Sequence, residues 1–234
     1  MNTEQKAGLY PLPETPIDAV SRTVREHVVL EGQTFLIDRP DESDRLLDHP
    51  FVTNAFARDE YLPYWTDLWP AARMLAKVIL REPWIPGIET LEIGCGLGLP
   101  GVAALAMGVR VTFSDYDATA LRFAERNARL NGFDQLKLLQ MDWRNPAEKL
   151  HFPIILASDL IYELRNVAPL VSLIKQVLVP DGLCLLTDQD RVHSQALRDT
   201  LSDEGMDYTV AAARAGEPGG KRVKGSLYRI RHKH

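Results

Sequence analysis

The segment of residues 90–101 reads TLEIGCGLGLPG and decides the fold. The apolar run over 90–93 predicts a strand, and the glycines at 94, 96 and 98 predict a tight turn after it. Pro100 suits the first turn of a following helix, because a backbone N–H at that position has no partner within the helix. A glycine-rich turn between a strand and a helix marks the ligand-binding edge of an open α/β sheet.

The same segment fits two classes of cofactor. Residues 96–101 match the G-x-G-x-x-G pattern of dinucleotide sites, whereas residues 92–98 match E-x-G-x-G-x-G. A carboxylate at Glu92 would repel a pyrophosphate, and Pro100 removes an N–H where that phosphate docks. S-adenosylmethionine has an ammonium and a sulfonium but no phosphate, so Glu92 suits it. We therefore expect S-adenosylmethionine, with an NAD-dependent oxidoreductase as the alternative.

Further acidic residues fall where the next strands end. Asp115 follows the second predicted strand, where a carboxylate can accept both ribose hydroxyls of either cofactor. Asp142 and Trp143 follow the third strand. Asp142 is placed to accept from an adenine amino group, while Trp143 either offers an aromatic face or packs as a structural residue. The cofactor residues expected in these loops are Glu92, Gly94, Cys95, Gly96, Gly98, Asp115, Tyr116, Asp142 and Trp143.

Strands and helices alternate along the rest of the chain. Unbroken apolar runs such as IILA and LCLL are typical of strands buried on both faces of a parallel sheet. The last two strands have no helical pattern between them, which predicts an antiparallel pair. The predicted strands are 90–93, 109–114, 136–141, 154–157, 183–187, 208–213 and 226–231, and the predicted helices are 67–81, 99–107, 118–130, 167–178 and 192–203.

The first sixty residues differ from this pattern. We interpret residues 1–16 as a flexible leader, 27–30 and 34–37 as a small hairpin around Gly32, and 38–48 as an acidic loop. The prediction is one α/β domain over 61–234, preceded by an N-terminal extension over 1–60. A chain of 234 residues is long enough for one sizeable core.

Composition excludes several classes of protein. Hydrophobic residues make up 45% and charged residues 25%, and no apolar run approaches the ~20 residues that span a bilayer. Two cysteines, no secretory signal and apolar surroundings for both thiols predict a cytoplasmic protein without disulfides. The six histidines are scattered and unpaired with cysteine, so no metal site is expected.

The charge is uneven along the chain. The net charge is −5, but residues 214–234 carry seven Lys or Arg and one Glu, a local charge of +6 that leaves −11 elsewhere. Nucleic-acid-binding proteins usually present a broad basic face, so a nucleic-acid partner is not expected. The basic C-terminal segment is interpreted as a solvated hairpin.

With these motifs together, the chain resembles the class I, seven-stranded S-adenosylmethionine-dependent methyltransferases from about residue 61 onward. The resemblance rests on Glu92-x-Gly-x-Gly-x-Gly98, Asp115, the Asp142-Trp143 pair and the order of elements. It implies a Rossmann-like, doubly wound sheet of seven strands in the order 3-2-1-4-5-7-6, with strand 7 antiparallel.

A narrower resemblance rests on Asp159-x-x-Tyr162 and on the segment PYWTDLWP over 63–70. Both are similar to the protein-lysine methyltransferase branch of this fold. The resemblance implies that Trp69 and Ser158 line the cofactor pocket and that Asp159 lies beside the substrate amine. Tyr162 either bonds the amine or closes a wall of the site. Tyr61, Tyr64 and Trp65 form an aromatic rim or anchor the first helix.

The function expected from these residues is N-methylation of a lysine side chain in a protein substrate. A small-molecule N- or O-methyltransferase and a noncatalytic S-adenosylmethionine-binding module remain as alternatives. The sequence does not specify the substrate, the degree of methylation or the oligomeric state.

Overall fold

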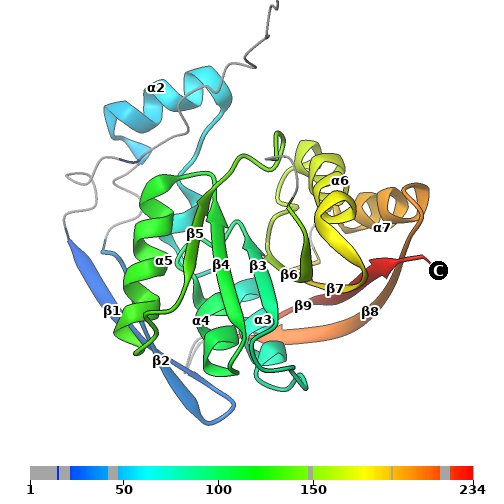
Figure 1. Ribbon diagram of the computed structural model, residues 1–234. Coiled ribbons are helices and arrows are strands. Elements are labelled where there is room, and N and C mark those ends of the chain that lie inside the picture. Colours follow the sequence, from blue (N-terminus) through cyan, green and yellow to red (C-terminus); the bar gives the residue numbers. More distant parts are fainter. Residues whose placement is uncertain are drawn as a thin grey trace, which may run out of the picture.

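The computed structural model describes residues 15, 22–41, 47–146, 150–190, 192–216 and 222–233, with the backbone alone at 58 and 59. A seven-stranded sheet forms its centre (Figure 1). The order β5-β4-β3-β6-β7-β9-β8 is 3-2-1-4-5-7-6 when counted from β3, and β9 is antiparallel to both neighbours, which confirms the predicted topology. The strands are β3 (Glu89–Ile93), β4 (Arg110–Asp115), β5 (Lys137–Gln140), β6 (Phe152–Ser158), β7 (Leu178–Asp188), β8 (Met206–Ala215) and β9 (Val223–His232).

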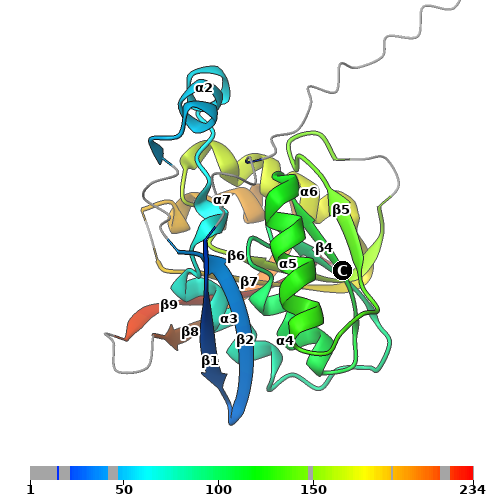
Figure 2. The ribbon, with the colours of Figure 1, turned by 90° about the vertical axis from the view of Figure 1, so that its left-hand side faces the viewer.

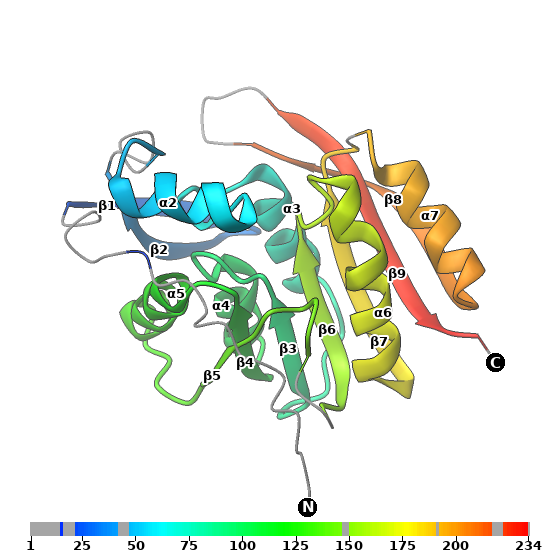
Figure 3. The same ribbon diagram turned by 90° about the horizontal axis from the view of Figure 1, so that it is seen from above.

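Helices cover both faces of the sheet, as Figure 3 shows from above. One face carries α3 (Pro70–Ile79), α4 (Leu99–Ala106) and α5 (Ala118–Leu130). The other carries α6 (Val167–Val177) and α7 (Ser194–Asp203). Short 3₁₀ turns, η2 (Tyr64–Thr66) and η3 (Leu164–Asn166), precede α3 and α6. Among the described residues, no helix has both the length and the apolar character needed to cross a membrane.

Strand β6 shows why apolar and polar residues do not alternate in the sequence of a central strand. Ile154 and Leu156 pack into the core beneath α3, α4 and α5, whereas Ile155 and Ala157 pack into the core beneath α6 and α7. Successive side chains of a strand point to opposite faces, so a strand covered on both faces is apolar at every position.

The N-terminal hairpin is present and longer than predicted. Strands β1 (Thr23–Leu30) and β2 (Gln33–Pro40) pair antiparallel, and the connecting Glu31 and Gly32 both have positive φ. The outer edge of β2 is satisfied by two amide side chains of α5. Asn131 exchanges two hydrogen bonds with the backbone of Leu36 (2.8 and 2.9 Å), and Asn127 does the same with Asp38 (2.8 and 3.0 Å). These amides fix the hairpin against the domain.

The predicted acidic loop over 38–48 is wrong at its start, because Asp38 belongs to β2. Only 2% of Asp38 is exposed, but its carboxylate pairs with Arg25 at 2.7 Å and Arg126 at 2.8 Å. The hydrogen bond from Arg25 lowers the pKa of Asp38 below its usual value. Two guanidinium groups thus allow an acidic residue to continue a buried strand. Residues 42–46 of the predicted loop lie outside the described residues.

Helix α2 (Pro50–Asp59) was not predicted from the sequence. Its N-cap is His49, whose Nδ1 accepts from the Phe51 N–H at 3.2 Å, and Pro50 occupies its first turn. A proline directly after a capping residue is the sequence signal that could have predicted the start of this helix. Figures 1 and 2 show α2 projecting from one end of the molecule. The helix ends at Asp59, and the next residue, Glu60, has a left-handed backbone conformation.

Gly101→Ala is expected to destabilise the protein by about 1–3 kcal/mol, the usual cost of overpacking a buried position. A Cβ at this point of α4 would lie 2.3 Å from Phe113 Cε1 and 2.4 Å from Glu92 Oε2. The measurement is the free energy of unfolding in urea. Gly108→Ala is the control, since it has φ of +80° but no atom within 4 Å of the added Cβ, and therefore reports backbone strain alone. A Gly101→Ala variant as stable as wild type would show that the first turn of α4 is not tightly packed against Phe113 and Glu92.

Candidate functional site

A cavity of about 350 Å³ lies beyond the carboxyl ends of β3, β4 and β6. Its volume falls within the range of about 300–1,000 Å³ that is usual for small-molecule sites. The structure brings nine of the residues predicted for the site into its lining: Trp69, Gly94, Gly96, Asp115, Tyr116, Asp142, Trp143, Asp159 and Tyr162. Four other predicted residues, Glu92, Cys95, Gly98 and Ser158, do not line it.

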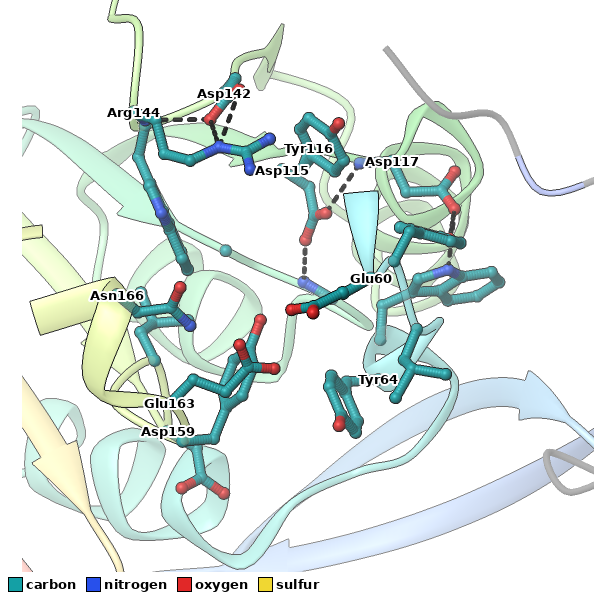
Figure 4. Close-up of a pocket in the computed structure, with 18 of the residues that line it drawn as sticks. Glu60, Tyr64, Asp115, Tyr116, Asp117, Asp142, Arg144, Asp159, Glu163 and Asn166 are labelled. Atoms are coloured by element: carbon teal, nitrogen blue, oxygen red, sulfur yellow. Dashed lines mark hydrogen bonds and ion pairs between the residues drawn. The ribbon is translucent and has the colours of Figure 1, made fainter. Parts of the chain in front are cut away.

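Asp115, the last residue of β4, holds the glycine loop with its carboxylate. Oδ2 accepts from the Gly96 N–H at 2.8 Å, and Oδ1 accepts from the Asp117 N–H at 3.0 Å (Figure 4). Burial raises the pKa of Asp115 to about 6. The backbone of Tyr116 also bonds to this carboxylate, which with about four lone pairs still keeps capacity to accept from a ligand hydroxyl.

Gly94 and Gly96 give the cavity a bare backbone floor. Both have positive φ, of 58° and 51°. A Cβ on Gly94 would lie 2.6 Å from Leu160 Cδ2 and 3.1 Å from the ring of Trp143, two other lining residues. Position 94 therefore favours glycine for both its conformation and its space, and position 96 for its conformation.

Glu92 has a different place from the one the E-x-G-x-G-x-G pattern suggests. It is 2% exposed, and its Oε2 accepts from the Gly101 N–H in the first turn of α4 at 3.0 Å. Burial raises the pKa of Glu92 well above its usual value. The carboxyl group lies behind the glycine loop, where it joins the end of β3 to α4.

Asp142 and Tyr116 both contact Arg144, a residue that the sequence reasoning missed. Arg144 Nε lies 2.9 and 3.0 Å from the two Asp142 oxygens, and its guanidinium carbon lies 5.3 Å from the centre of the Tyr116 ring (Figure 4). Arg144 also lines the cavity. Its position directly after Asp142-Trp143 could have indicated it, because residues adjacent to a ligand-facing residue in a loop often face the same ligand.

Asp159 follows β6 in an unusual backbone conformation. Its φ is 58°, a left-handed value that costs a non-glycine residue of order 1–3 kcal/mol and is typical of functional sites. Its N–H donates to Thr187 O at 2.9 Å, and its Oδ2 accepts from Gln189 Nε2 at 2.5 Å. Both partners come from the end of β7. The neighbouring strand thus fixes the backbone and the carboxylate of Asp159, and Gln189 is a second residue that sequence reasoning missed.

Aromatic rings line the same cavity as Asp159. The rings of Tyr64 and Tyr162 have centroids 4.8 Å apart, and those of Tyr64 and Trp69 are 6.2 Å apart. Trp69 Nε1 donates to the Tyr64 carbonyl at 2.7 Å, which joins η2 to the start of α3. Burial raises the pKa of Tyr162 to about 12, so this phenol keeps its proton at neutral pH and is available as a hydrogen-bond donor.

The mouth of the cavity is formed by residues from two distant parts of the chain. Arg165 of η3 pairs with both Glu60, after α2, and Glu163. These three residues line the cavity. The ion pairs connect the residue after α2 to the segment that follows Asp159, so Glu60 contributes to the site.

The lining is predominantly acidic. It contains six carboxyl groups, from Glu60, Asp115, Asp117, Asp142, Asp159 and Glu163, against the guanidinium groups of Arg144 and Arg165. Such a cavity favours cationic ligands. Within the described ranges, no three His, Cys, Asp or Glu side chains are grouped so that they could hold a metal ion.

Proteins similar to this chain are methyltransferases. It is 36% identical over 129 residues to a histidine protein methyltransferase 1 homolog of Dictyostelium discoideum, covering 52% of this chain and 42% of that one. It is 31% identical over 103 residues to the electron transfer flavoprotein beta subunit lysine methyltransferase of Danio rerio, covering 43% and 40%. The matches thus span less than half the length of these relatives.

A solved structure shares the fold. The ribosomal protein L11 methylase of Lactobacillus delbrueckii subsp. bulgaricus superposes with a TM-score of 0.57 at 21% identity, covering 68% of this chain and 77% of that one. Residues 65–199 also match the family described as lysine methyltransferase, which is more than half of the chain. This protein therefore belongs to the lysine methyltransferase family, and its cofactor is S-adenosylmethionine.

Proposed function

We propose that this protein is an S-adenosylmethionine-dependent N-methyltransferase that methylates a lysine side chain of a protein substrate. The observation that carries the proposal is Asp159, a carboxylate held by Gln189 and lining the same cavity as the glycine loop and Asp115. A carboxylate attracts the ammonium of a lysine, and the aromatic rings of Tyr64 and Tyr162 favour a cation at their faces.

The chemistry of the acceptor fits this arrangement. The bound cofactor supplies a methyl group activated by its sulfonium, so the main task of the protein is to position the amine, which can contribute about 7–11 kcal/mol. A lysine with a pKa near 10.4 must also lose a proton, which costs about 4.6 kcal/mol at pH 7. Asp159 recruits and aligns the ammonium. Tyr162 keeps its own proton and so is not the base, and the lysine proton leaves to water.

The residues of the cavity fit the cofactor. We assign Asp115 to the ribose hydroxyls, since its carboxylate retains acceptor capacity beside the loop. Gly94 and Gly96 let the backbone approach the ligand, while Asp142, Trp143 and Tyr116 form the adenine end. Trp69 contributes an aromatic wall of the same cavity. Glu92 acts indirectly, through the Gly101 N–H that it holds.

The organisation of the chain follows from these roles. We propose a methyltransferase domain over residues 61–234 and a substrate-facing extension over 1–60. Glu60 at the mouth and the hairpin packed on α5 support the extension's contribution. Cys95 and Cys184 are both buried and free, which agrees with a cytoplasmic location, where thiols stay reduced.

The test uses S-adenosylmethionine with a labelled methyl group. The purified protein is incubated with the labelled cofactor and cell extract, proteins are separated from metabolites, and labelled protein is hydrolysed for mass spectrometry. Label in N-methyllysine supports the proposal. Label in methylarginine or methylhistidine overturns the lysine assignment, and label among metabolites alone overturns the protein substrate. Cofactor binding without any transfer would mark a noncatalytic module.

Cofactor affinity is expected to fall as the pH drops below about 6. Asp115 has a pKa of about 6 without ligand, and its ionised form is acceptor-only, whereas protonation turns one oxygen into a donor. Ligand binding therefore favours the carboxylate, so the affinity is constant above pH 7 and decreases up to tenfold per pH unit below pH 6. Calorimetric titration between pH 5 and 8 measures it. An affinity that rises toward pH 5 would contradict the role of Asp115.

A further inference from the structure

Asp117 is the centre of a buried hydrogen-bond cluster next to the cofactor cavity. It caps α5, with Oδ1 accepting from the Thr119 N–H at 2.7 Å. Oδ2 accepts from Trp65 Nε1 at 3.0 Å and from the hydroxyl of Tyr61. Tyr61, Trp65 and Asp117 all line the cavity, and Asp117 is labelled in Figure 4.

Thr15, from the N-terminal leader, completes this cluster. Its N–H donates to Asp117 Oδ1 at 3.2 Å, and its hydroxyl donates to Oδ2 at 2.5 Å. The same hydroxyl oxygen lies 2.8 Å from that of Tyr61, and Thr119 Oγ1 donates to the Thr15 carbonyl at 2.7 Å. Thr15 has no exposed surface. Thr15 thus bonds to Asp117 and Thr119, which lie more than 100 positions away along the chain, and its hydroxyl contacts that of Tyr61.

The cluster is energetically coupled because its members share one carboxylate. A buried carboxylate must be satisfied by hydrogen bonds, and the loss of one donor costs more than the bond itself contributes. Burial and the charge of Asp117 raise the pKa of Tyr61 above its usual value, so Tyr61 remains a donor. The position of the Tyr61 and Trp65 walls therefore depends on the full set of donors to Asp117.

We infer that Thr15 is a positioning residue of the cofactor site, which fixes the Tyr61 and Trp65 walls through the carboxylate of Asp117. This inference rests on the proposed function, since it concerns the same cavity. Thr15 touches neither the cavity nor the reacting atoms and acts through Asp117. The leader, which the sequence reasoning treated as a flexible segment, accordingly contributes to cofactor affinity.

The test is Thr15→Val in the full chain, which keeps the shape of the side chain and removes its hydroxyl. We expect the Kd for S-adenosylmethionine, measured by calorimetry, to rise about tenfold, the effect of one buried hydrogen bond. The KM for the cofactor rises with it, while kcat at saturating cofactor stays within about twofold. Thr15→Ser, which restores the hydroxyl, returns the Kd to the wild-type value.

A matched control and a second variant separate this role from a general loss of stability. Thr209→Val changes an exposed threonine on β8 and leaves the Kd unchanged. Thr119→Val removes the hydrogen bond to the Thr15 carbonyl and, like Thr15→Val, raises the Kd for S-adenosylmethionine. An unchanged Kd in folded Thr15→Val overturns the inference, as does a Kd that Thr15→Ser fails to restore. A wild-type protein that binds no S-adenosylmethionine overturns the proposed function itself.

Discussion

Asp159→Asn is expected to lower turnover about 10- to 100-fold while the Kd for S-adenosylmethionine stays within about twofold. Hydrogen bonds to charged groups contribute about 1.5–3 kcal/mol, and each 1.36 kcal/mol changes a rate tenfold. The asparagine has nearly the same shape but no charge to attract the lysine ammonium. Its amide oxygen can still accept from Gln189 Nε2, so the substitution removes the charge and keeps this hydrogen bond.

The measurement is single-turnover methyl transfer together with cofactor titration of the same preparation. Asp207→Asn, an exposed aspartate on β8, is the matched control and should retain wild-type turnover. Because Asp159 has a left-handed φ of 58°, which asparagine also tolerates, the substitution adds no backbone strain. Retention of turnover in Asp159→Asn would show that this carboxylate does not position the amine.

Asp115→Asn is expected to weaken cofactor binding about 100-fold. Both oxygens of Asp115 accept a backbone N–H, one from Gly96 and one from Asp117. An asparagine amide must therefore place its NH₂ group against one of these donors, which disrupts the glycine loop in addition to losing an acceptor for a ribose hydroxyl. The two effects together correspond to about 2–3 kcal/mol.

Calorimetric titration of S-adenosylmethionine measures this change, with melting temperature as the check on folding. Asp134→Asn, in the exposed connection between α5 and β5, is the control and should bind normally. If Asp115→Asn binds with wild-type affinity, the ribose assignment fails, and the cavity must hold the cofactor in another orientation. The weakening of binding below pH 6 should also disappear in this variant.

The difference between Glu92 and Asp159 shows which features of the site residue patterns can predict. The E-x-G-x-G-x-G pattern correctly locates the loop, but the side chain of Glu92 points behind it and accepts from the Gly101 N–H. Spacing specifies that a carboxylate ends a strand, not which side of the loop it faces. Asp159 also follows a strand end, and there the residue lines the cavity, with a left-handed backbone and its Oδ2 held by Gln189.

Some residues of the site belong to none of the sequence motifs and reach it through contacts with distant segments. Glu60, Gln189 and Thr15 each reach the site or its supporting cluster through a contact with a distant segment: Arg165, Asp159 and Asp117. None of these three belongs to a local pattern with a period or a fixed spacing. Helix α2 was missed for a related reason, because its signals were only a histidine cap and a proline.

The sequence by itself determined the alternation of strands and helices, the antiparallel pairing of the last two strands and the position of the glycine loop. These follow from apolar periodicity and from the conformations open to glycine and proline, which act over a few residues, whereas the order of the strands was implied by the family resemblance. The tertiary structure alone decided where each carboxylate points and what holds it. Those features depend on partners up to about a hundred residues away, which come together only when the hairpin, the leader residue Thr15 and the strand ends pack around one cavity.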